Sequence, residues 1–178
     1  DDDGERIWTA GSPSGFGGPI DCYHTYSMSW TAYWLLKWKQ DLVDDERIMP
    51  MCEEYAEFLL RNQEENGFIP SYFEEDDLSV DPDMEMNIES AEPAASALFL
   101  AEMYKVTKEK KYLDAAAKAI RYVEENIVPE CKWFDFETFY SCSPKEYGYY
   151  DEITGQFAQC NMAMFMTTKT SYTFIQIN

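Results

Sequence analysis

The fold of this chain is decided by one stretch, Asn87–Ile127, which reads NIESAEPAASALFLAEMYKVTKEKKYLDAAAKAIRYVEENI. From Pro93 to Val106 its residues are apolar almost all round, and a helix with so little polar face is surrounded by protein. The second half has a single apolar stripe at helical spacing, and its other side is charged. The stripe consists of Tyr112, Leu113, Ala116, Ile120, Val123 and Ile127. We therefore predict an inner helix, a turn at Thr107–Lys110, and an outer helix that covers the inner one and faces water.

An earlier part of the chain has the same organisation. The stretch Tyr23–Leu42 is apolar all round, Val43–Asp45 forms a short turn, and Glu46–Gln63 is one-sided again. Equivalent points such as Ile48 and Tyr112 lie on the order of 65 residues apart, and a fixed period of this kind indicates a repeat architecture. The sequence therefore predicts a second inner–outer hairpin.

A third inner helix is expected to begin near Cys160 or Asn161. It starts with the apolar run MAMFM but continues as TTKTSYTFIQIN, which is rich in threonine and has poor helix propensity. The chain ends about halfway through this third unit. We predict a single, incomplete all-α domain over residues 1–178, with residues 1–20 as an irregular loop rich in Gly, Ser and Pro. Such a fragment should expose apolar surface at its final segment, so we expect the isolated chain to aggregate or to be inactive.

The loop lengths predict where the chemistry lies. Short turns join inner to outer helices at one end, while long connections join outer to inner helices at the other end. The long loops and the N-termini of the inner helices therefore gather at one rim of the molecule. Function is usually carried by loops on a rigid scaffold, so this rim is the expected site.

Charge and composition exclude several classes of function. The formal net charge of −20 argues against nucleic acid and anionic membranes, which require clustered Lys and Arg. No apolar run is long enough to span a bilayer. The five cysteines have irregular spacing without a CxxC pair, and with one histidine they favour scattered thiols over a zinc site, although a single disulfide stays open. We therefore expect no metal and no cofactor.

The second hairpin resembles a known family. The segment YKVTKEKKYLDAAAKAIRYVEEN is similar to the "A…Y…TGDxxYLxxA" hairpins of six-hairpin (α/α) toroid glycosidases, with Thr107–Glu109 reading TKE in place of TGD. The segment ENGFIPSYF also looks like the loop before an inner helix in those enzymes. The resemblance covers most of the chain but only about two and a half of the six hairpins. It implies a toroid fragment, whereas the reaction stays open, because lyases, epimerases and terpene cyclases share related toroids.

Two carboxylates in a long loop are candidate catalytic groups. The segment WFDFETFY, Trp133–Tyr140, places Asp135 and Glu137 among aromatic rings. Aromatic rings stack on sugars, and an apolar pocket raises the pKa of a carboxyl so that it can act as a general acid. The alternative is that either side chain accepts backbone hydrogen bonds in an ordered loop.

Three further polar residues lie at the starts of the inner helices. Glu89 is a candidate second carboxylate, because glycoside hydrolysis requires a pair of them. Glu92 precedes Pro93 and is explained as a helix cap. His24, the only histidine, either binds a substrate hydroxyl or shuttles a proton, or else it is a satisfied structural residue.

Other side chains suggest ligand contacts. Tyr72, Trp133 and Tyr140 are candidate sugar platforms, although aromatic rings also close loops over a core. The segment DPDMEMN imitates the ligand spacing of a calcium loop at Asp81, Asp83, Glu85 and Asn87. However, it lacks the glycine of the sharp turn, so a solvated acidic loop is the preferred interpretation.

These features together predict a glycoside hydrolase acting on an oligosaccharide, as part of a longer protein. Glu137 or Asp135 protonates the leaving oxygen and Glu89 activates water, while Trp133 and Tyr140 hold the sugar. One alternative is a non-catalytic carbohydrate-binding or interaction module. A lyase or epimerase is a further alternative, disfavoured by the scarcity of basic residues and of histidine. The compartment stays open, with the periplasm or the extracellular space favoured.

Overall fold

The computed structural model describes residues 22–74, 77–80, 82, 87, 89–133, 149–157 and 161–177. This part of the chain is mainly helical, as predicted, while the toroid repeat stays a prediction. The loop expected over residues 1–20 lies outside the described residues. The helices are α1 (Thr25–Asp41), α2 (Ile48–Asn62), α4 (Pro93–Thr107), α5 (Lys110–Asn126) and α7 (Asn161–Ile177). The strands are β1 (Cys22–His24), β2 (Tyr72–Glu74), β3 (Tyr150–Asp151) and β4 (Gln156–Phe157).

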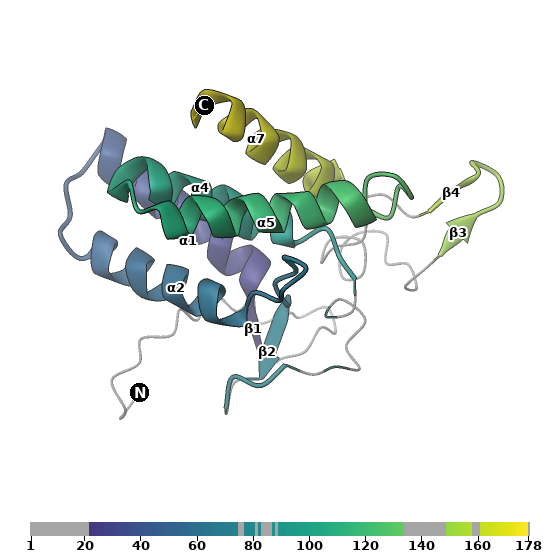
Figure 1. Ribbon diagram of the computed structural model, residues 1–178, viewed down its shortest axis with the longest axis horizontal. Coiled ribbons are helices and arrows are strands. Elements are labelled where there is room, and N and C mark those ends of the chain that lie inside the picture. Colours follow the sequence, from purple (N-terminus) through teal and green to yellow (C-terminus); the bar gives the residue numbers. More distant parts are fainter. Residues whose placement is uncertain are drawn as a thin grey trace.

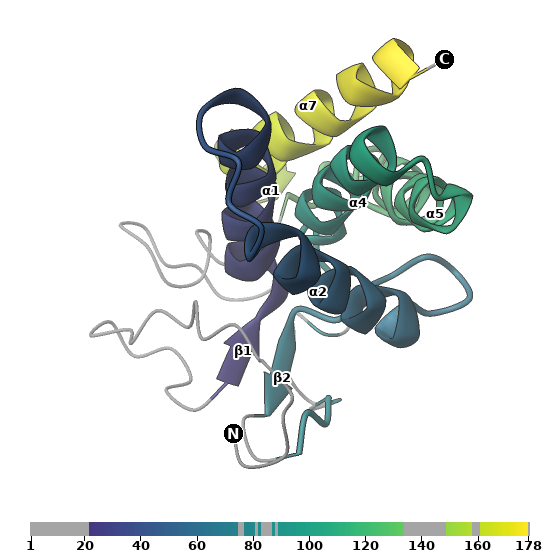
Figure 2. The same ribbon diagram turned by 90° about the vertical axis from the view of Figure 1, so that its left-hand side faces the viewer.

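Helix α4 lies at the centre of the bundle. Figure 2 shows it with α1, α2, α5 and α7 around it, and it packs against all four. Every residue from Pro93 to Met103 is buried, including the alanines on all of its sides. The absence of a polar face thus has the predicted structural consequence.

The α4–α5 hairpin forms as the sequence predicts. Lys108 ends α4 in the left-handed conformation with φ 63°, and its N–H donates to the carbonyl oxygen of Tyr104 at 2.8 Å. This is a common way to end a helix, because it satisfies a carbonyl group of the last turn. Helix α5 then buries Tyr112, Ala116 and Val123 against α4 and leaves its charged side exposed.

Helix α1 differs from its prediction. All-round burial was expected, but α1 buries only one side, and Trp34 and Trp38 are each 52% exposed. The described neighbours of this helix, chiefly α4 and α2, lie on its buried side. An apolar composition shows that a helix can be buried on every side, whereas actual burial depends on which neighbours are present.

Helix α7 forms in spite of its threonines. Thr167 and Thr173 donate to the carbonyl oxygens four residues earlier, while Thr170 also donates to Ala94 of α4 at 2.9 Å. These bonds satisfy the hydroxyls of a weak helix former, and packing against α4 offsets its low propensity. The outer side of α7 exposes Phe165 and Ile175, the latter by 73%, as predicted for the final segment.

The predicted rim is confirmed in the described residues. The N-termini of α1, α4 and α7 lie at the same end of the bundle as the C-termini of α2 and α5 (Figure 1). Strands β1 and β2 pair there in antiparallel register, with His24 opposite Tyr72. Lys132, beside Trp133, reaches Glu89 near the start of α4 at 3.2 Å. Among the described helices, none is both long and apolar enough to cross a membrane.

The far half of α4 carries a buried carboxylate. Lys37 of α1 donates to Glu102 Oε1 at 2.9 Å, and Gln40 donates to the same atom at 3.1 Å. Burial alone would raise the pKa of Glu102, but these hydrogen bonds, together with the charges of Lys37 and Lys105, outweigh it and lower the pKa. The ionised carboxylate therefore fixes α1 against α4.

We predict that Glu102→Gln destabilises the protein by about 2 kcal/mol at pH 7, because it removes charge-assisted hydrogen bonds. A lowered folded-state pKa stabilises the fold above the ordinary carboxyl pKa, and this contribution disappears as the pH falls through the folded-state value. The difference between wild type and variant in urea unfolding should therefore shrink below about pH 4.3. Asp114→Asn, which breaks the exposed pair with Lys110, should have little effect at any pH. An equal loss in both variants would contradict the prediction.

The loop after α2 depends on a glycine. Gly67 has φ +97°, and a Cβ at this position would lie 2.3 Å from the carbonyl oxygen of Lys118 in α5. Only a residue without a side chain permits this contact between the loop and α5.

We predict that Gly67→Ala lowers the free energy of unfolding by at least about 2 kcal/mol, since backbone strain and a backbone clash add together. Gly155→Ala is the matched control, because its φ is +70° but its Cβ would meet only the Tyr150 hydroxyl at 3.7 Å. It should cost about 1 kcal/mol. Chemical denaturation of both variants measures the difference, and equal losses would refute the role of the close approach.

Candidate functional site

The candidate site is built around His24, which is the last residue of β1 and immediately precedes α1. The antiparallel pairing of β1 with β2 places its ring against that of Tyr72, with centroids 4.7 Å apart and 18° between the planes. The ring of Tyr26 also stacks on the imidazole at 5.8 Å. These contacts bury His24 to 5% exposure and fix the orientation of its ring.

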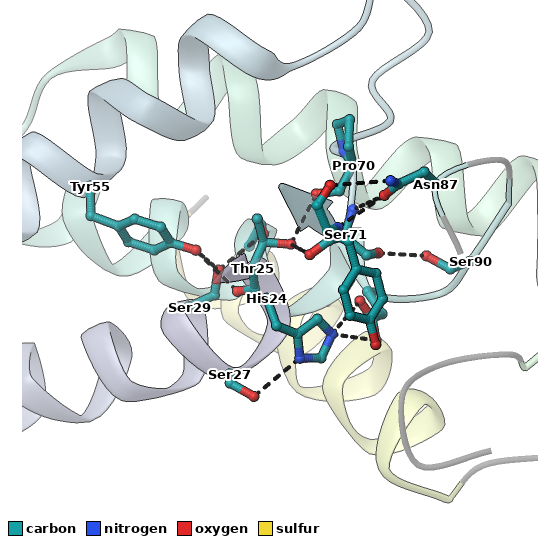
Figure 3. Close-up of polar contacts among 12 residues, drawn as sticks. His24, Thr25, Ser27, Ser29, Tyr55, Pro70, Ser71, Asn87 and Ser90 are labelled. Atoms are coloured by element: carbon teal, nitrogen blue, oxygen red, sulfur yellow. Dashed lines mark hydrogen bonds and ion pairs between the residues drawn. The ribbon is translucent and has the colours of Figure 1, made fainter. Parts of the chain in front are cut away.

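A polar scaffold holds the β2 side of the site. Asn87 Oδ1 accepts hydrogen bonds from the backbone N–H groups of Ser71 and Tyr72, both at 2.9 Å, and its amide donates to the Tyr72 carbonyl at 3.1 Å. Thr25 Oγ1 donates to the Pro70 carbonyl at 3.0 Å (Figure 3). Buried backbone groups that lack a sheet partner are thus satisfied by side chains.

Glu92 approaches His24 from the start of α4. Its two carboxylate oxygens lie 2.9 and 3.0 Å from His24 Nε2, and its side chain has 0% exposure. Glu92 occupies the N-cap position of α4, as the sequence indicated, but its side chain makes no capping hydrogen bond. Pro93 follows at the first helical position and has no N–H to offer. The carboxylate instead lies near the positive end of the helix dipole and accepts from the imidazole.

The second nitrogen of His24 contacts a serine. Nδ1 lies 3.2 Å from Ser27 Oγ, one turn further along α1. Ser27 is only partly buried, unlike His24 and Glu92. The three polar groups thus form a chain from a buried carboxylate to a serine nearer the surface.

A hydroxyl cluster lies beneath this chain. Tyr55 Oη donates to the Thr25 carbonyl at 3.0 Å and lies 2.8 Å from Ser29 Oγ, which in turn lies 3.0 Å from Ser96 Oγ. Burial raises the pKa of Tyr55, the hydrogen bond with Ser29 lowers it, and the charge of Glu92 raises it again, so the net shift is upward. Tyr55 is therefore a neutral donor that ties α2 to the first turn of α1.

Glu89 lies at the same rim in a different setting. Its Oε2 is 3.2 Å from Lys132 Nζ, and both side chains are partly exposed. Trp133 follows Lys132 in the sequence, is partly buried and packs against the core. The three site residues predicted in the following loop, Asp135, Glu137 and Tyr140, lie outside the described residues.

Tyr72 has a role that sequence reasoning missed. It was predicted as a sugar platform, but it is only 3% exposed and one face of its ring covers His24. Sequence reasoning also missed the Glu92–His24–Ser27 contacts. A signal was present, because His24 and Glu92 stand at the starts of α1 and α4, 68 residues apart, close to the period predicted from the sequence.

The described residues contain no group of side chains suited to a metal ion. The acidic residues of the calcium-like segment lie outside the described ranges, and both lone pairs of the Asn87 carbonyl are used by backbone donors. Cys52 and Cys131 are free thiols, and for these two of the five cysteines the prediction of scattered thiols is confirmed. Burial raises the pKa of Cys52 to about 12, which makes it unsuited to nucleophilic chemistry.

We predict that Tyr55→Phe lowers the free energy of unfolding by about 1–3 kcal/mol, because it leaves the buried Thr25 carbonyl without this donor and the buried Ser29 hydroxyl without its hydrogen-bond partner. Tyr122→Phe is the control, since Tyr122 is also buried and its hydroxyl makes no hydrogen bond within the described residues. Thermal and urea unfolding should show a small effect for this control. If both variants lose the same stability, the hydroxyl cluster does not fix the site.

Comparisons with known proteins leave the site to be interpreted from its own chemistry. Neither the family models, nor the curated proteins, nor the solved structures gave a match.

Proposed function

We propose that the chain belongs to an (α/α) toroid that hydrolyses the glycosidic bonds of an oligosaccharide at the rim around the N-terminus of α4. The observation that carries the proposal is the convergence of Glu89, Lys132 and Trp133 at this rim, where the inner helices begin. Carboxylates beside aromatic rings suit sugars, because rings stack on the apolar faces of pyranoses while carboxylates bind hydroxyls and transfer protons.

The proposed mechanism needs a second carboxylate opposite Glu89. Asp135 or Glu137 serves as the general acid that protonates the leaving oxygen, and Glu89 activates water. Inversion would require the two carboxyls to lie about 6.5–9.5 Å apart, and retention about 5–5.5 Å. Glu92 is not a candidate for either role, because its carboxylate is fully buried and bound to His24.

Lys132 gives Glu89 a defined geometry. Its ammonium lies 3.2 Å from the carboxylate, and both groups are partly exposed, so a substrate hydroxyl can bind beside them. In the proposed complex Trp133 and Tyr140 hold the sugar rings, while Tyr72 supports His24 beneath the rim.

A binding function without catalysis is the second candidate. It is favoured by the pairing of the two carboxylates nearest the start of α4, Glu89 with Lys132 and Glu92 with His24. In that case the aromatic groups would bind glycans and no bond would be cleaved. The two candidates differ in whether reducing ends are released.

We predict that Glu89→Gln lowers the release of reducing ends from a responsive glycan by at least about 100-fold, as expected for loss of a general base. The assay uses the longest native polypeptide that contains this chain, screened against a panel of oligosaccharides. Glu125→Gln, a change at an exposed carboxylate of α5, should leave the rate unchanged.

Binding is measured on the same panel by the change in tryptophan fluorescence. Trp133→Ala should weaken binding, whereas Trp38→Ala, at the far end of α1, should not. Glycan binding without product would favour the non-catalytic module. If neither binding nor product is found for any glycan, both candidate functions fail.

A further inference from the structure

The Glu92–His24–Ser27 chain has the arrangement of a nucleophile, a base and an orienting acid. Nucleophilic catalysis by serine requires a base within about 2.6–3.2 Å of the hydroxyl and a third group that orients the base. Ser27 Oγ lies 3.2 Å from His24 Nδ1, and Glu92 lies 2.9 Å from His24 Nε2. Such a triad is identified by the roles and distances of its members, whatever their order in the chain.

An ionised Glu92 selects the tautomer that this chemistry needs. An ionised carboxylate is only an acceptor, so the matching tautomer of His24 carries its proton on Nε2. A neutral imidazole with its proton on Nε2 presents a lone pair at Nδ1. That lone pair faces Ser27 Oγ and can take its proton.

The exposure of the three side chains increases from Glu92 to Ser27, as expected for a nucleophilic site. The Glu92 side chain has 0% exposure, His24 lies beneath two tyrosine rings, and Ser27 is partly exposed. The acid and the base are thus shielded from water while the hydroxyl is nearest to a substrate. Figure 3 shows Ser27 on the side of the imidazole away from the polar scaffold of Ser71 and Asn87.

The other buried serines of this region are engaged differently. Ser29 and Ser96 bond to each other, and Ser29 also bonds to Tyr55, while Ser71 lies 3.3 Å from Ser90. Within the described residues, Ser27 is the serine whose hydroxyl contacts an imidazole nitrogen. Its own N–H belongs to the first turn of α1, where no intrahelical acceptor exists, so it can donate to a developing oxyanion.

We propose that Ser27, His24 and Glu92 form a catalytic triad that hydrolyses short-chain carboxylic esters at this rim.

In the proposed reaction, Ser27 Oγ attacks the ester carbonyl carbon and its proton passes to His24 Nδ1. The C–O bond to the alcohol breaks, and His24 returns the proton to the leaving alcohol. Water then attacks the acyl-serine, gives one proton to His24, and releases the carboxylic acid as Ser27 recovers its proton. This activity goes beyond the proposed glycan hydrolysis and uses none of its acids.

The proposal is tested with a fluorophosphonate probe and with 4-nitrophenyl acetate as substrate. We expect the probe to label Ser27, as located by peptide mass spectrometry, and the folded protein to release 4-nitrophenol. Ser27→Ala should abolish labelling, and His24→Gln should reduce both signals at least about 100-fold. Glu92→Gln should reduce them while it keeps a hydrogen bond to the ring. Ser171→Ala is the control, because the Ser171 hydroxyl contacts a carboxylate directly, that of Glu124 at 3.4 Å, and has no histidine to act as its base.

A second measurement covers the case in which His24→Gln does not fold, as checked by circular dichroism. In Ser27→Cys the new thiol should react with iodoacetamide at pH 7 at least about tenfold faster than the exposed thiol of Cys131, because an adjacent imidazole promotes the thiolate. The proposal is overturned if the folded protein shows no labelling at Ser27, or if labelling persists in a folded His24→Gln variant. Equal alkylation of the two thiols would also overturn it. These readouts do not depend on glycan cleavage, so the two proposals can fail separately.

Discussion

The burial of α4 on every side from Pro93 to Met103 is the constraint on which the rest of this structure depends. A helix whose alanine, leucine and phenylalanine side chains occupy every side is stable only when neighbours cover each of them. Helices α1, α2, α5 and α7 supply that cover, although their own sequences range from strongly amphipathic to threonine-rich. The small alanine side chains let these neighbours approach closely, so a short central helix organises the described core.

The same constraint places polar groups at the N-terminus of α4. Once the inner helices lie side by side with their N-termini at one end, His24 of the first unit must stand near Glu92 of the second. Side chains then fix the irregular segment around Ser71, because Asn87 and Thr25 make hydrogen bonds with its backbone groups. The position of the candidate site therefore follows from the common end at which α1 and α4 begin, whereas its detailed chemistry follows from individual side chains.

This division explains how much the sequence could predict. The hairpin Asn87–Ile127 and the common rim followed from hydrophobic periodicity and loop length, which act locally and recur along the chain. The exposed side of α1 did not follow, because Trp34 is apolar whether or not a neighbour covers it. Glu92 was interpreted as a cap because a carboxylate beside Pro93 usually is one; only its contact with a histidine 68 residues away reveals its other partner.

The Glu92–His24 pair is difficult to explain by stability alone. Burying a carboxylate costs several kcal/mol, and a pair of well-packed apolar side chains often stabilises a fold as well or better. The helix dipole at the start of α4 offsets only about 0.3–2 kcal/mol of this cost. A buried acid that orients an imidazole toward a more exposed hydroxyl is, however, the arrangement that proton transfer requires. The extra cost at this position is thus consistent with selection for chemistry, and the packing of Pro93–Met103 in the central helix α4 provides the stability that tolerates it.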